Sequence, residues 1–485
     1  MLHPSTMYRF RKQRGVNLGS WFVLERWITA HPFRSAAAPA QSDLDVARGH
    51  HARAILEEHY DNWITDADWT WIAQHGFNSV RLPIGFYHLC GADASVLHST
   101  DFAEFGAVFS GAWSRIVHAI ECARRHGLGV LIDLHAAPGK QNPDSHSGSS
   151  GLPTFFTNPQ NRQQTIHALR TLARQLKALD LVNVVGIELL NEPHPTSDSI
   201  LKQWYSDACD ALAAVDPTMP IYVGDCWKTE QYTDFVKSKA QNVALMGLDH
   251  HLYRCFTAED IKTPAPVHTR SLSDPNAHIP KLFARVADTL DEAGAGLVIG
   301  EWSGALNPGS LTGSPDDAKT YIAAQLALYE AHCVGYYFWT YKKDGGPDRG
   351  WCLRDAVESG VYPDAPRGVV PSSRFVAVDH DLERRQCARD AIKDRALENH
   401  TAYWSRFPGK YQHARFADGF VLGWDDAYAF LTFEAAPNKP CSELAFVGAL
   451  ARMRTRDHGS SFWEFRHGFQ QGAAEAKKDF SANYC

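Results

Sequence analysis

The amino-acid sequence predicts an α/β fold, a (β/α)8 TIM barrel with a helical C-terminal extension. Three observations support this prediction. Eight short aliphatic runs recur between residues 13 and 342, stretches of helical spacing separate them, and strand-like runs cease after about residue 370. Near-continuous apolar strands that alternate with helices are typical of parallel strands covered on both faces. Eight strand–helix units are the number that closes a barrel.

The expected strands end in polar or glycine-rich segments. They lie at residues 13–19, 79–85, 129–135, 184–192, 220–225, 243–251, 296–303 and 336–342. The stretches between them carry apolar side chains at helical spacing, for example residues 112–127, 165–178 and 320–333. A doubly wound open sheet would show the same alternation and is the competing architecture.

We expect two domains, a barrel over residues 1–370 and a helical extension over residues 371–485 that packs on the barrel. The extension is expected to contain helices at residues 381–407, 416–434 and 463–480. Long loops rich in Gly, Pro, Ser and Asn follow three predicted strands, at residues 83–100, 137–158 and 253–280. Barrel enzymes build their active sites from loops at this end of the strands.

Composition and charge restrict the class of protein. The 485-residue chain is 44% hydrophobic with a net charge of −7, which predicts a globular protein without affinity for nucleic acid or anionic membranes. It contains no run of about 18 apolar residues that could span a membrane. The N-terminal segment lacks the apolar stretch of a secretory signal, so we expect a cytoplasmic location. Ten singly scattered cysteines are typical of reduced thiols.

Polar and aromatic side chains concentrate where the predicted strands stop. These strand-end residues are Arg81, Asp133, His135, Asn191, Glu192, His250, His251, Tyr253, Glu301, Trp302 and Trp339. A purely structural barrel would not need them, because a buried charge costs several kcal/mol unless it is paired. Their concentration at one end of the strands therefore favours a functional site.

Two carboxylates, Glu192 and Glu301, end the predicted fourth and seventh strands and would face each other across the barrel mouth. Glycoside hydrolysis requires such a pair, one acid to protonate the leaving oxygen and one carboxylate to attack the anomeric carbon. The environment separates the two roles by raising one pKa and lowering the other. Arg81 and Tyr253 are candidates to hold Glu301 ionised, and Asn191 is a candidate donor to a sugar 2-hydroxyl.

Other strand-end residues have both a functional and a structural interpretation. His135 and His251 could bind sugar hydroxyls or orient the carboxylates, while Trp339 and Trp351 could stack on a pyranose ring. Taken singly, a tryptophan at a strand end is more often part of a core than a sugar platform, and His250 and His251 could be a hydrogen-bonded core pair. No His-Glu-x-x-His motif or Cys/His cluster with ligand spacing is present, so we expect no metal site.

Several motifs, in their order along residues 13–365, resemble glycoside hydrolase family 5, and within it the fungal exo-β-1,3-glucanases. They are RGVNLGSWFVLERWITAHPF (14–33), VRLPIGF, IDLHAAPGKQN, LLNEPH, DHHLYRCF, IGEWSGAL and FWTYK. The resemblance implies a retaining barrel enzyme with Glu192 as acid/base and Glu301 as nucleophile. It also implies a substrate-binding set formed by Glu25, Arg81, His135, Asn142, Asn191, His251, Tyr253, Phe256, Trp339 and Trp351.

The chain departs from the secreted members of that family in the loop at residues 142–148. Asp144, Ser145 and His146 replace an aromatic residue and an Asp–Asn pair there. The resemblance implies that this loop shapes the glucose pocket and its entrance, the other half of which is Phe256. The helical extension has no counterpart in the secreted enzymes and resembles an extended, intracellular branch of the family.

We therefore expect a retaining exo-acting β-glucosidase that needs no cofactor and releases glucose from the non-reducing end of β-1,3-glucan or its oligosaccharides. One alternative is a β-glucosidase of the same fold that acts on a glycolipid, such as glucosylceramide or a steryl glucoside, or on another β-glucoside. A broad apolar groove beside the pocket would favour it. The other is a non-catalytic glycan-binding barrel, against which the presence of both Glu192 and Glu301 argues.

Overall fold

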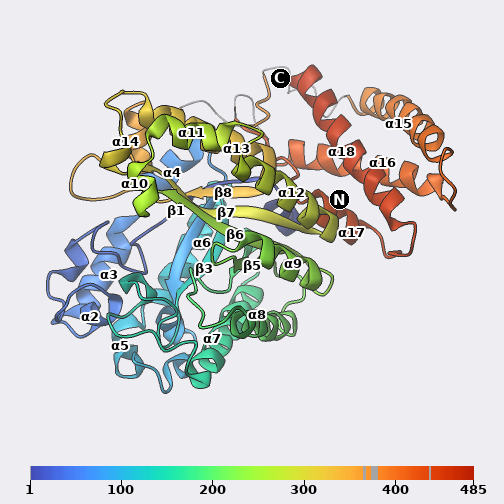
Figure 1. Ribbon diagram of the computed structural model, residues 1–485. Helices are drawn as coiled ribbons and strands as arrows, with labels where there is room; N and C mark the ends of the chain where they lie inside the picture. Colours follow the sequence, from blue (N-terminus) through green and yellow to red (C-terminus); the bar gives the residue numbers. More distant parts are fainter. Residues whose placement is uncertain (1, 364–367, 373–380, 436–438) are drawn as a thin grey trace. The chain divides into compact units, whose positions relative to one another are not determined.

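The computed structural model describes residues 2–363, 368–372, 381–435 and 439–485, and it confirms the predicted barrel (Figure 1). Eight strands close in sequence order, and β1 pairs in parallel with both β2 and β8. This closure excludes the doubly wound open sheet. The strands are β1 (Gln13–Asn17), β2 (Ser79–Gly85), β3 (Gly129–Ala136), β4 (Val184–Glu188), β5 (Ile221–Gly224), β6 (Met246–Arg254), β7 (Ala295–Leu306) and β8 (Gly335–Phe338).

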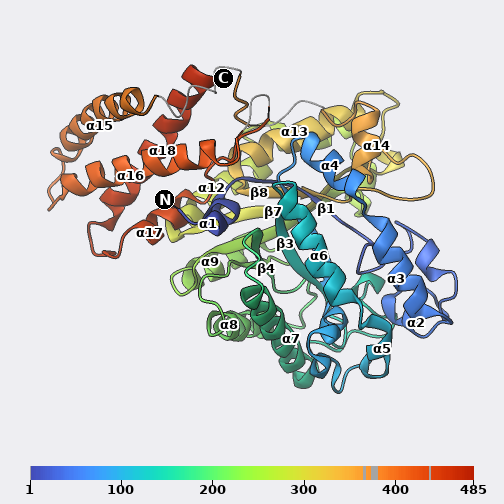
Figure 2. The same ribbon diagram turned by 180° about the vertical axis from the view of Figure 1, so that it is seen from behind.

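Helices surround the strands, as Figures 1 and 2 show from opposite sides. The three stretches expected between strands correspond to α6, α7 and α13. The α-helices are α2 (Asp43–Ala47), α3 (Ala52–Trp63), α4 (Asp66–Gln74), α5 (Gly106–Phe109), α6 (Ala112–Arg125), α7 (Pro159–Ala178), α8 (Asp198–Ala213), α9 (Thr229–Lys239), α10 (Ala258–Lys262), α11 (Ala265–Ser273), α12 (His278–Ala293), α13 (Asp317–His332) and α14 (Leu353–Glu358). Short 3-10 helices are η1 (His31–Phe33), η2 (Phe86–Gly91), η3 (Ala94–Leu97), η4 (Ala103–Phe105), η5 (Ser145–Ser147) and η6 (Pro308–Ser310).

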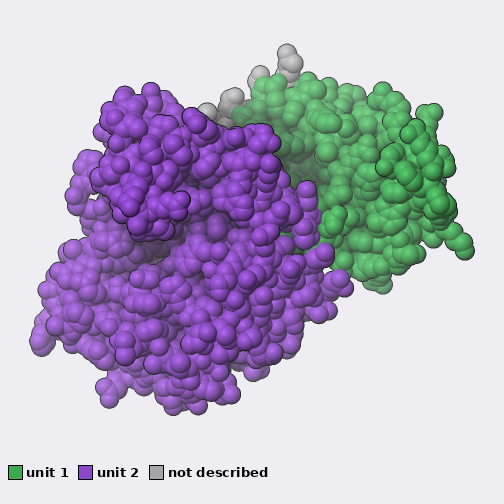
Figure 3. Space-filling view, viewed as in Figure 1, with its two compact units in different colours: residues 1–12, 290–295, 365–485 green, residues 13–289, 296–364 purple. Residues whose placement is uncertain are grey.

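The chain forms two compact units, which Figure 3 colours separately. The barrel unit contains residues 13–289 and 296–364, and the helical unit contains residues 1–12, 290–295 and 365–485. The helical unit contains α1 (Pro4–Phe10), α15 (Leu382–Trp404), α16 (His413–Thr432), α17 (Val447–Arg454) and α18 (Phe462–Tyr484). The prediction of a helical C-terminal part is therefore confirmed. None of the helices in the described ranges combines the length and apolar character needed to cross a membrane.

Two tyrosine rings lie buried in the barrel core, and glycines on the neighbouring strands leave room for them. A Cβ atom at Gly186 or Gly247 would lie 2.4 or 2.3 Å from the ring of Tyr222. A Cβ atom at Gly15 would lie 2.2 Å from the ring of Tyr337. Any larger residue at these three positions would displace a ring. The barrel is thus a packed core, and the polar site occupies its open end.

Strand β4 ends earlier than the sequence predicted, at Glu188 rather than at Glu192. Backbone pairing continues beyond its end, because the amide of Asn191 donates to the carbonyl of Leu134 at 3.1 Å. Glu192 then has a φ of 41°, a left-handed conformation that non-glycine residues seldom adopt. This turn at Glu192, immediately before Pro193, ends the extended segment.

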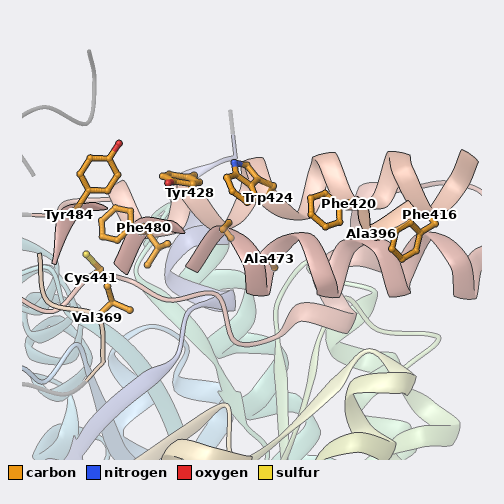
Figure 4. Packing of buried hydrophobic residues seen from close by; sticks show 13 residues of the cluster. Val369, Ala396, Phe416, Phe420, Trp424, Tyr428, Cys441, Ala473, Phe480 and Tyr484 are labelled. Carbon is orange, nitrogen blue, oxygen red and sulfur yellow. The ribbon is translucent and has the colours of Figure 1, made fainter. Parts of the chain in front are cut away.

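Helices α16 and α18 contact each other closely in the helical unit (Figure 4). A Cβ atom at Gly419 would lie 2.0 Å from the carbonyl oxygen of Phe465, and one at Gly468 would lie 1.9 Å from that of Phe416. Gly423 and Gly472 repeat these contacts one turn further along, so the two helices run parallel. An aromatic cluster extends along the pair and contains Phe416, Phe420, Trp424, Tyr428, Phe480 and Tyr484.

Gly468→Ala should destabilise the helical unit, because the new methyl group would overlap the carbonyl of Phe416 and force the helices apart. Overpacking of this kind costs about 1–3 kcal/mol. Differential scanning calorimetry of the full chain measures the effect. Gly459→Ala is the control, since Gly459 is exposed and a Cβ atom there meets only the Asp457 carboxylate, at 3.1 Å. An unchanged unfolding temperature in G468A would show that the helices do not touch at this position.

Candidate active site

A cavity of about 1400 Å³ lies at the C-terminal ends of the barrel strands. Arg81 is fully buried beside it, and Asn142 lies behind Glu192, where its Nδ2 donates to the Glu192 carbonyl at 3.0 Å. All other predicted site residues line the cavity: Glu25, His135, Asn191, Glu192, His251, Tyr253, Phe256, Glu301, Trp339 and Trp351. The structure therefore brings the whole predicted set into one region.

Arg81, in β2, lies at the centre of a buried network of charges. Its guanidinium donates to Glu188 at 2.7 and 3.1 Å and to Glu301 at 2.9 Å, and it lies 3.0 Å from Asp133. Asn191 Oδ1 accepts a further hydrogen bond at 2.9 Å. Burial raises the pKa of Asp133 and of Glu188 although Arg81 opposes the rise. One cation among three carboxylates thus does not offset the cost of burying all three in their ionised form.

Sequence reasoning missed Glu188 and Asp249 as members of this site. Both are buried, in β4 and β6. Both acids lie within apolar runs of the sequence, and this pattern could have identified them. An ionised side chain inside a barrel requires a partner, so an acid in such a run indicates a charged or hydrogen-bonded site. Glu188 has Arg81 as that partner, and Asp249 accepts a hydrogen bond from the amide of Gly300 at 2.6 Å.

Glu301 is positioned by an irregularity in β7. The register of β7 against β8 shifts between Ile299 and Trp302, where β7 contains one extra residue. Gly300 permits this bulge, because a Cβ atom there would lie 2.2 Å from the Asp249 carboxylate. Bulges of this kind redirect a side chain, and here Glu301 lines the cavity.

The carboxylate of Glu301 accepts two hydrogen bonds that favour its ionised form. Arg81 donates to Oε1 at 2.9 Å, and the Tyr253 hydroxyl donates to Oε2 at 2.8 Å. Burial nevertheless raises the pKa of Glu301 to about 7, with the charge of Glu192 acting in the same direction and those of His251 and Arg81 against it. The environment therefore places this carboxylate close to its titration point near neutral pH.

Glu192 has the opposite shift. Burial alone would raise its pKa, but the hydrogen bond and charge of His251, with smaller contributions from His146 and His135, lower it to about 2. His251 Nδ1 lies 2.7 Å from Glu192 Oε1 and 3.6 Å from Glu301 Oε2. The facing oxygens of the two glutamates and this nitrogen all lie within 4.8 Å of one another.

His251 therefore lies between the two glutamates and holds a proton. Burial alone would lower its pKa, but the charges of Glu301 and Asp249 and the hydrogen bonds to Asp249 and Glu192 raise it well above the usual value. Its Nε2 lies 3.3 Å from Asp249. The hydrogen bond between His251 and Glu192 thus contains one transferable proton.

Glu25 contributes a neutral carboxyl group to the cavity. Its side chain accepts a hydrogen bond from the indole of Trp27 at 2.7 Å. Burial, together with the charges of Glu301 and Glu192, raises its pKa to about 8 despite this bond. At neutral pH the group can therefore both donate and accept hydrogen bonds.

Aromatic rings form much of the cavity wall. Trp351 lies 5.4 Å from both Trp27 and Tyr253 and 5.9 Å from Phe256, measured between ring centroids. Trp339 is stacked parallel to His135 at 5.7 Å. Phe256 is 68% exposed, which is unusual for so large an apolar side chain. It is accessible to a ligand at the cavity wall.

The loop that departs from the family pattern contributes a histidine to the cavity. His146, in η5, has its Nε2 3.8 Å from Glu192 and its ring 5.0 Å from that of His135. Burial lowers the pKa of His146 to about 4, so the ring is neutral at neutral pH. In the part of the chain that the structure describes, its buried Nδ1 has no hydrogen-bond partner. His146, which lines the cavity, is therefore a third unpredicted member of the site, after Glu188 and Asp249.

The acidic clusters of the cavity have the spacing of metal ligands but already contact protein cations. Glu192, His251 and Glu301 form one such group, and Glu188, Asp249 and His251 form another. Arg81 contacts Glu188 and Glu301, and a protonated His251 cannot ligate a metal. We therefore assign these groups to proton and carboxylate chemistry.

Comparison with known proteins places the chain in a family. A family model described as "Cellulase (glycosyl hydrolase family 5)" matches residues 47–345. A second one, described as "Glucan 1,3-beta-glucosidase 3 C-terminal domain", matches residues 385–480, within the helical unit. The chain belongs to glycoside hydrolase family 5, and it is a glycoside hydrolase.

Individual relatives agree with this assignment. "Glucan 1,3-beta-glucosidase 3" from Schizosaccharomyces pombe is 30% identical over 96% of this chain and 95% of its own length. "Probable glucan 1,3-beta-glucosidase A" from Aspergillus fumigatus is 32% identical over 72% of this chain and 87% of its own. The crystal structure of rutinosidase from Aspergillus niger has a TM-score of 0.59 at 18% identity, over 73% of this chain and 98% of its own, which shows the shared fold.

Arg81→Leu should destabilise the barrel by about 3–5 kcal/mol, because it leaves the buried carboxylates Glu188, Glu301 and Asp133 without their cation. The loss should shrink as the pH falls, since protonated carboxyl groups no longer need a positive partner. Urea unfolding between acid and neutral pH measures this. The control is Arg115→Leu, which removes a surface pair with Asp61 worth about 0–1 kcal/mol. Equal losses in the two variants would contradict the central role of Arg81.

Proposed function

We propose that the protein is a retaining, exo-acting β-glucosidase that removes glucose from the non-reducing end of β-1,3-glucan or its oligosaccharides. The observation that carries the proposal is the facing pair Glu192 and Glu301, whose oxygens lie within 4.8 Å of each other. Retaining enzymes hold their carboxyl groups about 5–5.5 Å apart, whereas inverting enzymes need about 6.5–9.5 Å to admit a water molecule. The names of the S. pombe and A. fumigatus relatives support the substrate class.

In the first half of the reaction, Glu301 attacks the anomeric carbon as the glycosidic bond breaks. Arg81 and Tyr253 stabilise the ionised form of Glu301 that attacks. Glu192 takes up the proton of its hydrogen bond with His251 and gives it to the leaving oxygen. The products are a glucosyl ester on Glu301 and a shortened glucan with a free hydroxyl group.

In the second half, the same proton pathway runs in reverse. Glu192, now ionised, accepts a proton from a water molecule that enters where the leaving group was. The water oxygen attacks the anomeric carbon, and the ester bond to Glu301 breaks. Glucose leaves in the β configuration, and the proton returns to the Glu192–His251 pair. Two inversions at one carbon produce net retention.

The exo mode rests on the residues around the terminal sugar. By the family resemblance, Glu25 contacts the terminal glucose and Trp351 lines its pocket. A neutral carboxyl group at Glu25 can both donate to and accept from sugar hydroxyls, which suits the end of a glucan chain. His146 adds a neutral imidazole beside Glu192, where it can bind a hydroxyl of the same sugar or of the next.

A second candidate substrate is a β-glucoside with an apolar aglycone, such as a steryl glucoside or glucosylceramide. Beyond Phe256 the same cavity is lined by aliphatic and aromatic side chains from the segment after β6, among them Val267, Ile279, Leu282 and Phe283. An apolar wall continuous with the glutamate pair could bind a hydrocarbon leaving group.

Proton NMR of the purified protein with laminaritriose should show β-glucose first, with the disaccharide as co-product. Retention, exo action and linkage are then measured together. Glu301→Gln, which keeps the side-chain shape but cannot attack, should lose this activity by a factor of at least about 10³. α-Glucose as the first product would contradict a retaining mechanism. Unchanged hydrolysis by E301Q would show that Glu301 is not the nucleophile. Cleavage of a steryl glucoside but not of laminaritriose would favour the second candidate.

The pH profile should report the titration of Glu301. Because the ionised form attacks, kcat/KM should rise with pH through about 7, the pKa of Glu301. Tyr253→Phe removes a donor to that carboxylate. The pKa of Glu301 should therefore rise further in this variant, and the acid limb of the profile should move to higher pH. Tyr60→Phe, a buried tyrosine that does not line the cavity, is the control. An acid limb that does not move in Y253F would contradict this assignment.

A further inference from the structure

The helical unit contains a cluster of side chains outside the active site that has the composition of a metal site. His400 lies in α15, His413 is the first residue of α16, and Glu464 lies in the first turn of α18. His400 Nε2 and His413 Nδ1 each lie 3.2 Å from the same atom, Glu464 Oε2. Two imidazole nitrogens thus converge on one carboxylate oxygen.

Burial makes the charge of Glu464 costly without a cation. Its side chain is fully buried, as is that of His400 at 2% exposure, while His413 is 26% exposed. Glu464 Oε1 accepts the amide of Gln412 at 2.6 Å, which directs Oε2 toward the two histidines. A buried carboxylate loses several kcal/mol of hydration that a nearby positive charge can restore. The partly exposed side of the cluster, at His413, gives an ion access.

Aromatic rings enclose the cluster. Tyr411 is stacked parallel to His413 at 5.5 Å, and the rings of Phe416 and Trp463 lie 4.2 and 5.8 Å from that of His400. Apolar surroundings of this kind restrict water and fix the orientation of ligands.

We propose that His400, His413 and Glu464 bind a divalent transition-metal ion of the zinc type. Two imidazoles and one carboxylate are a donor set that zinc accepts, and a water molecule would complete a tetrahedron. The observed nitrogen–oxygen spacings of 3.2 Å fit such a tetrahedron. Bonds of about 2.0–2.1 Å place neighbouring ligand atoms about 3.3 Å apart.

The proposed ion would connect three helices, of which α15 and α16 are consecutive and α18 follows later in the chain. The ligands come from the C-terminal part of α15, the start of α16 and the start of α18. Helices α16 and α18 are the pair that the glycine contacts hold together. Its role is therefore structural: it fixes α15 to this pair and neutralises the buried Glu464. Metal binding to the folded unit should raise its unfolding temperature by mass action.

Isothermal titration of the chelator-treated full chain with Zn²⁺ tests the proposal. The wild type should bind one equivalent of Zn²⁺. The affinity for this ion should be at least about tenfold lower in His413→Ala and in Glu464→Gln. His458→Ala, which removes an exposed histidine of the same unit, should leave this binding unchanged. Co²⁺ in place of Zn²⁺ should produce the visible absorption bands of a tetrahedral ion in the wild type and in H458A, but not in H413A.

Two outcomes would overturn the proposal. One is no zinc binding by the wild type, and the other is equal binding by the wild type and H413A. H413A is the deciding variant: His413 is 26% exposed, so we expect its loss to leave the fold intact. E464Q alters a buried acid and serves as the second variant. Zinc bound at the glutamates of the barrel would persist in H413A, so the difference between these two proteins measures only the helical site.

Discussion

Arg81 is buried in β2 and contacts carboxylates from β3, β4 and β7 through one guanidinium. The other features of the active site depend on this arrangement. The guanidinium connects strands that are distant in sequence, and it gives Glu301 one of the two hydrogen bonds that fix its orientation. One positive charge cannot balance three carboxylates, and burial makes the excess negative charge costly. Burial therefore raises the pKa of Asp133, Glu188 and Glu301 against the opposing charge of Arg81.

His251 controls where one proton of the site lies. In the substrate-free protein it holds the proton itself, which lowers the pKa of Glu192 and leaves Glu301 close to its titration point. Two carboxylates this close cannot both be ionised at no cost. In the mechanism that we propose, a bound sugar excludes water and weakens the ion pair between His251 and Glu192, and transfer of the proton to Glu192 then produces the acid. The three groups act as one titrating unit, not as two independent glutamates.

The sequence predicted most of the barrel and most of the site because both leave a periodic signal. Apolar runs mark the strands, and polar residues at their ends mark the open face, where Glu192, His251 and Glu301 do meet. Sequence reasoning failed where the signal is not periodic. The end of β4 depends on the left-handed conformation at Glu192, and the bulge at Gly300 depends on the Asp249 carboxylate. The apolar run around Glu188 indicates that this acid needs a partner, but only the structure identifies that partner as Arg81 of β2.

Along the chain, local pattern by itself determined the order of strands and helices, the helical character of the C-terminal part and the residue types at the strand ends. Only the tertiary structure decided which of these residues share a proton or a cation. It also decided that α16 and α18 touch through Gly419 and Gly468, and that His400, His413 and Glu464 converge on one point. The physical reason is the separation along the sequence over which each kind of interaction acts. Secondary structure follows from neighbours a few positions away, whereas charge pairing, pKa shifts and ligand geometry depend on distances of a few ångströms between residues separated by tens or hundreds of positions.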